Sequence, residues 1–272
     1  MSKIDEFYDS LILKGFEKIT IEGYKKTLNK LLKENQNPTK EQAERYLIEM
    51  RKKDYSYSHI KNSIIIIKRY MEFIGRLIEV ESPRRPLELP TKEILTEGEI
   101  ARILAETKNN REKAMLAILV YCGVRNKELC GLKVKNVDFE NNIIKVLGGK
   151  FKKDRIVPLS KECFRIILDY LKDYKRDEKD FLFTTLIKNE QYNGWALRKM
   201  VKKVAIRAKI KKRVYPHLFR HSLITHLLER GANVIAVQQL AGHANISTTM
   251  LYTHFSPKKI IQEYQYYIPA YT

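Results

Sequence analysis

The first eighty residues carry apolar side chains at intervals of three and four positions, which is the spacing of amphipathic helices. The apolar stripes run over residues 7–13, 24–32, 46–50 and 64–74. Only short polar segments separate them, and four helices with short connections are typical of a compact bundle. The pattern therefore predicts a helical domain over residues 1–80.

Residue types that begin helices accompany these stripes. Thr39 and Gln42 have the spacing of a capping box, and Ser56 is placed to cap the last helix of the bundle. Thr20 is the N-cap that we expect for the helix through Tyr24.

The helical pattern stops after residue 80. The segment from Glu81 onward contains Pro83, Pro86 and Pro90. Proline disfavours helix at its own position and at the preceding one, so this stretch is expected to be extended. We place a linker at residues 81–94, between two domains.

Helical patterning resumes with Thr96 and Glu99, another capping box, and continues in an apolar stretch over residues 111–122. Residues 141–147 and 154–159 are rich in Ile and Val and favour strands.

Gly148 and Gly149 allow a turn between these strands, which predicts a hairpin with lysines at its tip. Helices are expected from Ser160 onward. The predicted fold class is mainly α with a small antiparallel β-sheet. The second domain would cover residues 95–257, followed by a tail, 258–272, whose apolar stripe needs a groove for docking.

The charge of the chain is strongly positive. Lys and Arg number 52 against 32 Asp and Glu, which gives a net charge of +20. Residues 1–80 contribute only +4 of this, so the excess lies in the second part of the chain. Such an excess favours a polyanion such as nucleic acid or an anionic membrane, although a basic surface can also serve solubility alone.

Cys122, Cys130 and Cys163 lie in apolar surroundings and form no CxxC pair, so we expect buried, reduced thiols. No apolar segment is long enough to span a bilayer, and no secretion signal precedes the first helix. We expect a cytoplasmic protein associated with the nucleoid.

Several short motifs combine into one chemistry. They are Gly-Val-Arg ending at Arg125, Gly-Gly-Lys ending at Lys150, His-Leu-Phe-Arg from His217 to Arg220, Gly-His ending at His243, and Ser-Thr-Thr-Met-Leu-Tyr ending at Tyr252. Paired guanidinium groups can clamp the nonbridging oxygens of a phosphodiester, and a phenol can attack its phosphorus.

Each residue taken alone has a simpler interpretation. Arg125 could form a surface ion pair with Glu128, and His217 could cap a helix. His217 and His221 have a spacing that suits a metal, but Arg220 between them disfavours a cation there. Only the combination points to DNA strand cleavage.

These segments resemble the catalytic domain of the tyrosine recombinases, the phage-integrase and Xer family. The resemblance covers residues 95–255, with the motifs in the family's order, and the helical domain before the linker resembles the family's core-binding domain. Ser-Thr-Thr before Tyr-Thr-His and the two-domain layout resemble the Xer branch most.

The resemblance implies roles for the cationic residues. Arg125 and Arg220 would bind the scissile phosphate and stabilise its transition state. Lys150 would act as general acid toward the 5′ leaving oxygen.

The resemblance also assigns the nucleophile. Tyr252 would attack the phosphorus, His217 would assist removal of the phenol proton, and His243 would hydrogen-bond a nonbridging oxygen. Glu128 would orient a catalytic group without contacting the substrate itself. We expect no metal and no cofactor.

A basic segment after residue 195 is the predicted DNA contact, with the hairpin tip beside it. The expected DNA-binding residues are Arg198, Lys199, Lys202, Lys203, Lys152 and Lys153. The alternative is a solvated helix face that meets no partner.

The hypothesis is a site-specific recombinase that pairs two double-stranded DNA sites in a tetramer, and the compact layout favours resolution of chromosome or plasmid dimers. Three alternatives stay open: integration or excision of a mobile element, a type IB topoisomerase-like activity, and a catalytically silent DNA-binding protein. The tail can dock on its own subunit or on a neighbour.

Overall fold

The computed structural model describes residues 2–33, 37–81, 83, 93–147, 154–185 and 190–242. The chain divides into two compact units, Met1–Pro90 and Thr91–Thr272, and each is described by itself. Mainly helical structure with a small antiparallel sheet confirms the predicted fold class.

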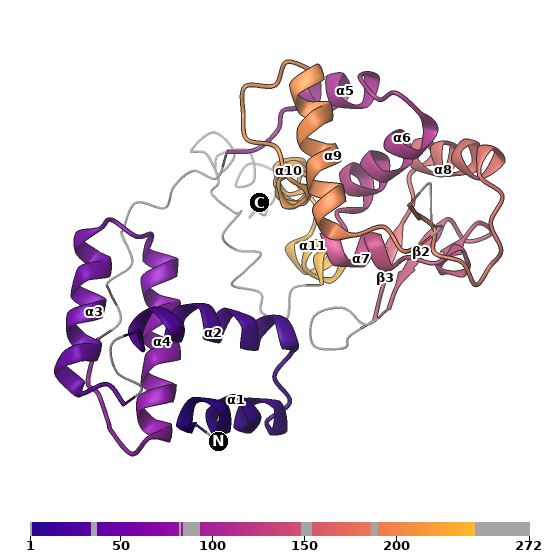
Figure 1. The fold of residues 1–272 in the computed structure, drawn as a ribbon. Coiled ribbons are helices and arrows are strands. Elements are labelled where there is room, and N and C mark those ends of the chain that lie inside the picture. Colours follow the sequence, from indigo (N-terminus) through magenta and orange to yellow (C-terminus); the bar gives the residue numbers. More distant parts are fainter. Residues whose placement is uncertain are drawn as a thin grey trace, which may run out of the picture. The chain divides into compact units, whose positions relative to one another are not determined.

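The first unit is a bundle of four helices (Figure 1). They are α1 (Lys3–Leu13), α2 (Lys18–Leu31), α3 (Lys40–Lys52) and α4 (Tyr57–Phe73). Helix α4 packs against both α2 and α3, and α1 lies along α2. Phe7 and Tyr70 meet edge to face in the core, with ring centroids 5.2 Å apart.

The capping signals explain where most of these helices begin. Thr39 and Gln42 form the expected capping box, and the Ser56 hydroxyl accepts a hydrogen bond from an amide in the first turn of α4. The prediction for Thr20 is wrong, because α2 begins at Lys18 and its N-cap is Glu17. Thr20 lies within the first turn.

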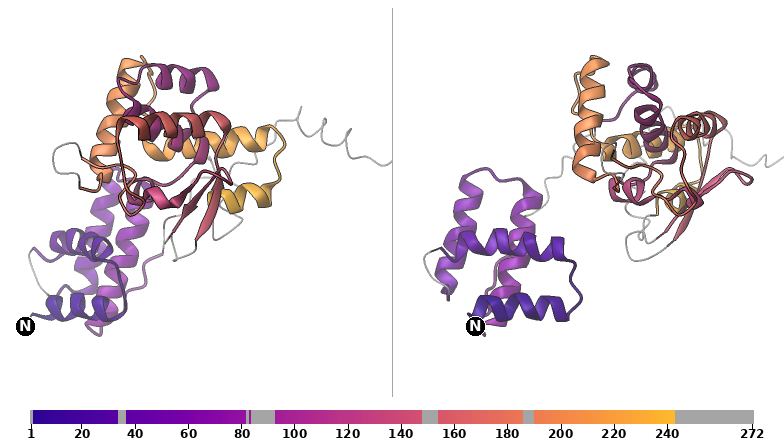
Figure 2. Two further views of the ribbon diagram at one scale, coloured as in Figure 1. Left: turned by 90° about the vertical axis from the view of Figure 1, so that its right-hand side faces the viewer. Right: turned by 45° about the vertical axis from the view of Figure 1, so that its right-hand side comes forward.

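The second unit surrounds its core with helices (Figure 2). They are α5 (Glu97–Ala105), α6 (Asn110–Ala117), α7 (Asn126–Gly131), α8 (Lys161–Asp173), α9 (Gly194–Arg207), α10 (Pro216–Glu229) and α11 (Val234–Ala241). The Thr96–Glu99 capping box starts α5 as predicted.

A three-stranded antiparallel sheet in the order β1-β2-β3 completes the second unit. Its strands are β1 (Val137–Asp138), β2 (Ile143–Val146) and β3 (Arg155–Pro158). The β2–β3 pairing, with Ile144 opposite Val157, confirms the predicted strand pair. The two-residue strand β1 was not expected, because it is too short to show an alternating pattern.

The predicted helix over residues 111–122 changes its winding before it ends. Residues 118–122 continue α6 as a π-helix, which stops at Gly123 with a left-handed φ of +57°. The π-helical residues are almost all buried against α10. π-helical turns are rare and often occur at functional sites, and the C-cap of this one, Gly123, lies two positions before Arg125.

All three cysteines are buried and free, as the sequence predicted. Among the residues that the structure describes, no helix is both long and apolar enough to cross a membrane.

Candidate active site

The turn after the π-helix lets the chain approach α10 very closely. A Cβ added at Gly123 would lie 2.9 Å from the Leu223 Cδ2 atom, so a side chain would not fit there. The Gly123 carbonyl accepts a 2.7 Å hydrogen bond from Arg220 Nη1. Gly123 therefore binds one predicted catalytic arginine, Arg220, and lies two positions before the other, Arg125.

Arg125 is the N-cap of α7 and is held by Glu128, in the first turn of that helix. The Arg125 amide donates to Glu128 Oε2 and its Nη1 donates to Oε1, both at 2.7 Å. The carboxylate therefore folds back to the helix N-terminus, where a negative charge is favoured. One edge of the Arg125 guanidinium is fixed by this contact.

A third arginine completes this cluster. Arg155, at the start of β3, donates from Nη1 and Nη2 to the two oxygens of Glu128, at 2.8 and 2.7 Å. Glu128 therefore accepts two hydrogen bonds on each oxygen, and its side chain is only 7% exposed.

The ionisation of Glu128 reflects these contacts. Burial alone would raise its pKa, but the hydrogen bonds from Arg155 and the Arg125 amide, together with their charges, lower the pKa to about 2. The carboxylate is therefore charged at every physiological pH.

Arg220 lies on α10 and is 4% exposed. Besides the bond to Gly123, its Nη2 donates to the carbonyl of Ala241, near the end of α11. Burying a guanidinium requires such partners, because an unpaired buried charge is very costly.

Three arginines converge on the last carbonyls of α11. Arg155 Nε donates to Leu240 at 3.0 Å, and Arg125 Nη2 donates to Gly242 at 2.9 Å. With the Arg220 bond to Ala241, three consecutive carbonyls each accept from a different arginine. The partial negative charge of a helix C-terminus favours cations there, so α11 gathers side chains from α7, β3 and α10.

His217 lies in the electric field of this cluster. Its pKa is lowered by burial and then by the positive charges of Arg220 and Arg125, while the charge of Glu128 acts in the opposite direction. The imidazole is therefore neutral near pH 7 and can accept a proton. The structure thus brings together four predicted residues: Arg125, Glu128, His217 and Arg220.

The remaining predicted residues lie outside the described part of the chain. They are Lys150, Lys152, Lys153, His243 and Tyr252. Gly242, whose carbonyl binds Arg125, directly precedes His243 in the sequence. Within the described ranges, no group of three His, Cys, Asp or Glu side chains is placed to hold a metal ion.

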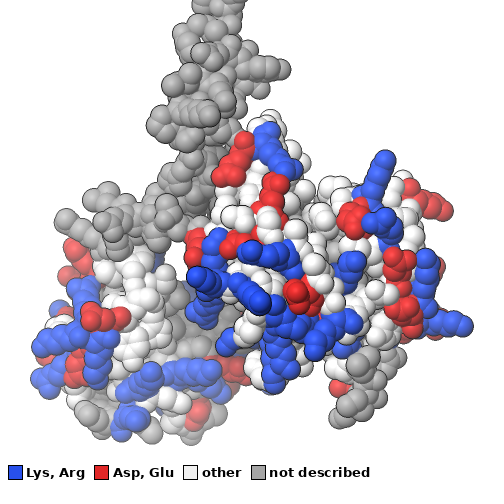
Figure 3. Space-filling view, turned by 90° about the horizontal axis from the view of Figure 1, so that it is seen from above, with Lys and Arg blue, Asp and Glu red and all other residues white. Residues whose placement is uncertain are grey.

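The basic segment after residue 195 forms α9 and the loop that follows it, and its cations divide into two groups. The four predicted DNA contacts are exposed: Arg198, Lys199, Lys202 and Lys203. Arg207 and Lys212 instead form ion pairs with Glu112 and Glu99 and thus support the fold. Figure 3 shows many exposed Lys and Arg side chains on the face in view, with acidic side chains interspersed.

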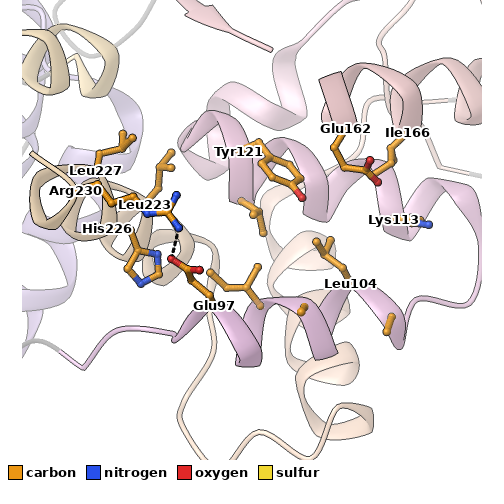
Figure 4. Close-up of a pocket in the computed structure, with 14 residues that line it drawn as sticks. Glu97, Leu104, Lys113, Tyr121, Glu162, Ile166, Leu223, His226, Leu227 and Arg230 are labelled. Carbon is orange, nitrogen blue, oxygen red and sulfur yellow. Dashed lines mark hydrogen bonds and ion pairs between the residues drawn. The ribbon is translucent and has the colours of Figure 1, made fainter. Parts of the chain in front are cut away.

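A separate apolar groove shares no lining residue with the arginine cluster. It has a volume of about 530 Å³ and lies between α5, the π-helical segment, α8 and α10 (Figure 4). Leu104, Ile166 and Leu227 are among its apolar walls, and Glu97 pairs with Arg230 at one end. The size and apolar character of this groove suit side chains rather than DNA.

The second unit combines helices with a small sheet, and three of its arginines bind carbonyls at the end of one helix. This combination is typical of the catalytic domain of a tyrosine recombinase. The chain belongs to the phage integrase family, whose model matches residues 93–259. It is a DNA strand transferase for site-specific recombination of the Xer type.

Individual relatives agree with this assignment. The tyrosine recombinase XerA of Pyrococcus horikoshii is 37% identical over 262 residues, which cover 94% of this chain and 90% of the relative. A crystal structure of XerA recombinase matches with a TM-score of 0.58 and 28% identity over 99% of both chains. The Tn1549 transposon integrase, solved with a circular intermediate DNA, has a TM-score of 0.78 over 96% of this chain and 98% of its own; at 20% identity it shows the fold alone.

Sequence reasoning missed one residue of the cluster. Arg155 lies in the strand predicted over residues 154–159 and was given no role of its own. An arginine at the start of a strand that is otherwise Ile, Val and Pro indicates a buried ion pair. The sequence does not identify the partner, because Glu128 lies 27 positions away.

Proposed function

We propose that this recombinase cuts and rejoins DNA through a covalent 3′-phosphotyrosyl bond at Tyr252. The observation that carries this proposal is the meeting of Arg125 and Arg220 at neighbouring carbonyls of α11, directly before His243. Two guanidinium groups at one place can stabilise the negative charge that grows on the nonbridging oxygens of a phosphate under attack.

The chemical step needs no external reactant. The phenol oxygen of Tyr252 attacks the phosphorus while its proton passes to neutral His217. The bond to the 5′ oxygen breaks, and Lys150 protonates that leaving oxygen. A 5′ hydroxyl of the partner duplex then attacks the phosphotyrosine, which forms the new phosphodiester and returns the phenol. His243 donates a hydrogen bond to a nonbridging oxygen.

Covalent capture tests this proposal directly. The wild-type protein is incubated with a pool of nicked duplexes of randomised sequence, in which the short cleaved strand diffuses away. We expect a protein–DNA adduct that survives denaturation, and sequencing the captured DNA identifies the site. The Tyr252→Phe variant is the control, since it keeps the fold and lacks only the attacking oxygen. An adduct that forms equally with the variant contradicts the assignment of Tyr252, and a protein that binds without an adduct is a silent DNA-binding protein.

We also propose that four subunits assemble on paired sites, with the tail, residues 258–272, of each subunit docked in the apolar groove of its neighbour. A segment of 30 residues follows the last described residue, Gly242, and the tail carries Ile260, Ile261 and Tyr264 at helical spacing. The groove offers matching apolar walls. Head-to-tail contacts of this kind close a ring when the rotation between subunits allows it.

A charge placed in the groove tests this assembly. Leu227→Lys should abolish the tetramer on DNA while single subunits still bind a half-site, and removal of residues 258–272 should have the same effect. Ile206→Lys is the matched control, because Ile206 is an exposed apolar residue outside the groove. Tetramers that persist in both groove and tail variants contradict docking in a neighbour.

The cellular role that we propose is resolution of chromosome or plasmid dimers at the nucleoid. The support is sequence similarity to the relative named XerA that extends over 94% of this chain. The captured site separates the alternatives: one chromosomal site supports dimer resolution, whereas sites at the ends of mobile DNA support integration or excision. Relaxation of supercoiled plasmid without paired sites would instead indicate a topoisomerase-like activity.

A further inference from the structure

Arg155 binds two separate elements with all three of its guanidinium nitrogens. Nη1 and Nη2 meet the two oxygens of Glu128 on α7, and Nε donates to the Leu240 carbonyl on α11. Its side chain is 8% exposed. All three nitrogens are therefore engaged within the protein, on two different elements.

The stem of Arg155 also makes a close contact. A Cβ added at Gly242 would lie 2.9 Å from the Arg155 Cδ atom. Gly242 adopts a left-handed φ of +59°, which ends α11 and leads into His243. Arg155 therefore packs against the residue that ends α11.

We propose that Arg155 is a positioning residue for strand cleavage, which aligns Arg125 through Glu128 and His243 through the end of α11. This inference rests on the proposed function of Arg125 and His243. Arg155 also begins β3, so its guanidinium joins this strand to α7 and α11.

The planar fork of arginine is essential to this role. It reaches both oxygens of a carboxylate in parallel and still leaves Nε for a third acceptor. A lysine offers a single ammonium, which can replace one of these contacts but not all three. Without Arg155, Glu128 keeps Arg125 alone as a partner, and the Leu240 carbonyl loses its cation.

Misplacement of reacting groups by about 1 Å costs on the order of 100-fold in rate. We therefore expect Arg155→Met to slow single-turnover adduct formation by about 100-fold at saturating DNA, with DNA affinity changed less than about threefold. Arg155→Lys should recover about tenfold of this loss. The probe is the nicked duplex that the wild-type protein captures from the randomised pool.

Arg207 supplies a matched control in the same unit. Its guanidinium also joins a carboxylate, Glu112, to a carbonyl at a helix end, Glu106, but away from the arginine cluster. Arg207→Met should lower the melting temperature much as Arg155→Met does, while adduct formation at a temperature where both variants are folded stays near the wild-type rate.

Hydrogen exchange adds a readout that does not depend on cleavage. The Gly242 amide donates to Gln239 in the last turn of α11. Its exchange should accelerate in Arg155→Met and not in Arg207→Met. If the wild-type protein forms no adduct yet this exchange pattern is seen, the proposed chemistry fails while the structural role of Arg155 stands.

Other results would overturn the proposal. Equal rate losses in Arg155→Met and Arg207→Met would mean that Arg155 only stabilises the fold. A loss of DNA affinity with an unchanged rate at saturation would mean that Arg155 contacts DNA. Unchanged exchange at Gly242 would mean that Arg155 does not hold the end of α11.

Discussion

Arg125 and Gly242 are joined by a 2.9 Å hydrogen bond from guanidinium Nη2 to the backbone carbonyl, across 117 positions of sequence. Arg125 is the N-cap of α7, and Gly242 is the C-cap of α11. The bond places a cation suited to a phosphate beside the residue that precedes His243. The end of α11 therefore belongs to the proposed catalytic site.

The first prediction concerns the glycine in this bond. In Gly242→Ala, the new methyl group meets the Arg155 stem at 2.9 Å and forces it to move. We expect adduct formation to fall by at least about tenfold, because the shift is passed to Glu128 and Arg125. Single-turnover cleavage of the captured duplex measures this loss.

Gly231 is the control for backbone strain. It also has a positive φ, +86°, but a Cβ there meets nothing within 4 Å. Both substitutions force an L-residue into the left-handed region, at a cost of about 1 kcal/mol. Gly231→Ala should therefore lose stability without losing cleavage, and an equal loss of cleavage would remove Arg155 from the explanation.

The second prediction concerns the charge of Glu128. Its pKa of about 2 lies below the ordinary value of 4.5, and each tenfold strengthening of the acid corresponds to about 1.4 kcal/mol. The ionised carboxylate thus stabilises the fold by roughly 3 kcal/mol at neutral pH. Because the folded pKa is the lower one, this stabilisation is complete above pH 4.5 and is lost as the pH falls toward 2.

Glu128→Gln should remove most of that free energy, since the buried guanidinium groups lose their counter-charge. Urea unfolding at pH 7 measures the difference. Asp169→Asn is the comparison, because the Asp169–Lys172 pair is exposed and contributes little. If both substitutions have the same small effect, Glu128 does not stabilise the cluster.

Local chemistry accounts for what could be predicted of the fold. The capping boxes at Thr39 and Thr96 mark helix starts because their bonds involve residues three positions apart. The β2–β3 pair follows from alternation of Ile and Val. Thr20 misled the prediction because a residue suited to capping can equally lie inside a first turn.

The site divides in the same way. Arg125, His217 and Arg220 could be found because each lies in a short motif with a recognisable family order. Arg155 could not, since its importance comes from Glu128 and Leu240, which lie 27 and 85 positions away. The π-helix was equally hidden, because an apolar run does not distinguish one helical winding from another.

The third prediction concerns the exposed face of α9. Lys202→Ala combined with Lys203→Ala should weaken DNA binding and reduce the slope of log affinity against log salt by about 0.9 for each phosphate that the protein no longer neutralises. Titrations of a labelled duplex between low and moderate salt measure the slope. Lys172→Ala is the matched control, as Lys172 is an exposed lysine on α8. An unchanged slope in the double variant would mean that this face of α9 is solvated and does not contact DNA.

The fourth prediction concerns proton transfer by His217. Burial and the charges of Arg220 and Arg125 lower its pKa in the DNA-free protein. Protonation would remove the base that accepts the Tyr252 proton. The cleavage rate at low DNA concentration, which reports the free protein, should therefore fall only as the pH drops below the ordinary histidine value of about 6.5.

The sign of this shift can be checked by nuclear magnetic resonance. Among the six histidines of the chain, the resonance that disappears in His217→Gln should titrate below the usual range. Glu128→Gln should lower that pKa further, because the carboxylate is the group that raises it. The unfolded chain binds the proton more tightly than the folded one, so His217 also makes the fold less stable as the pH falls below about 6.5. A His217 that titrates above the ordinary value would mean that the two arginines do not act on it, and the proposed convergence of these residues around one phosphate would then be wrong.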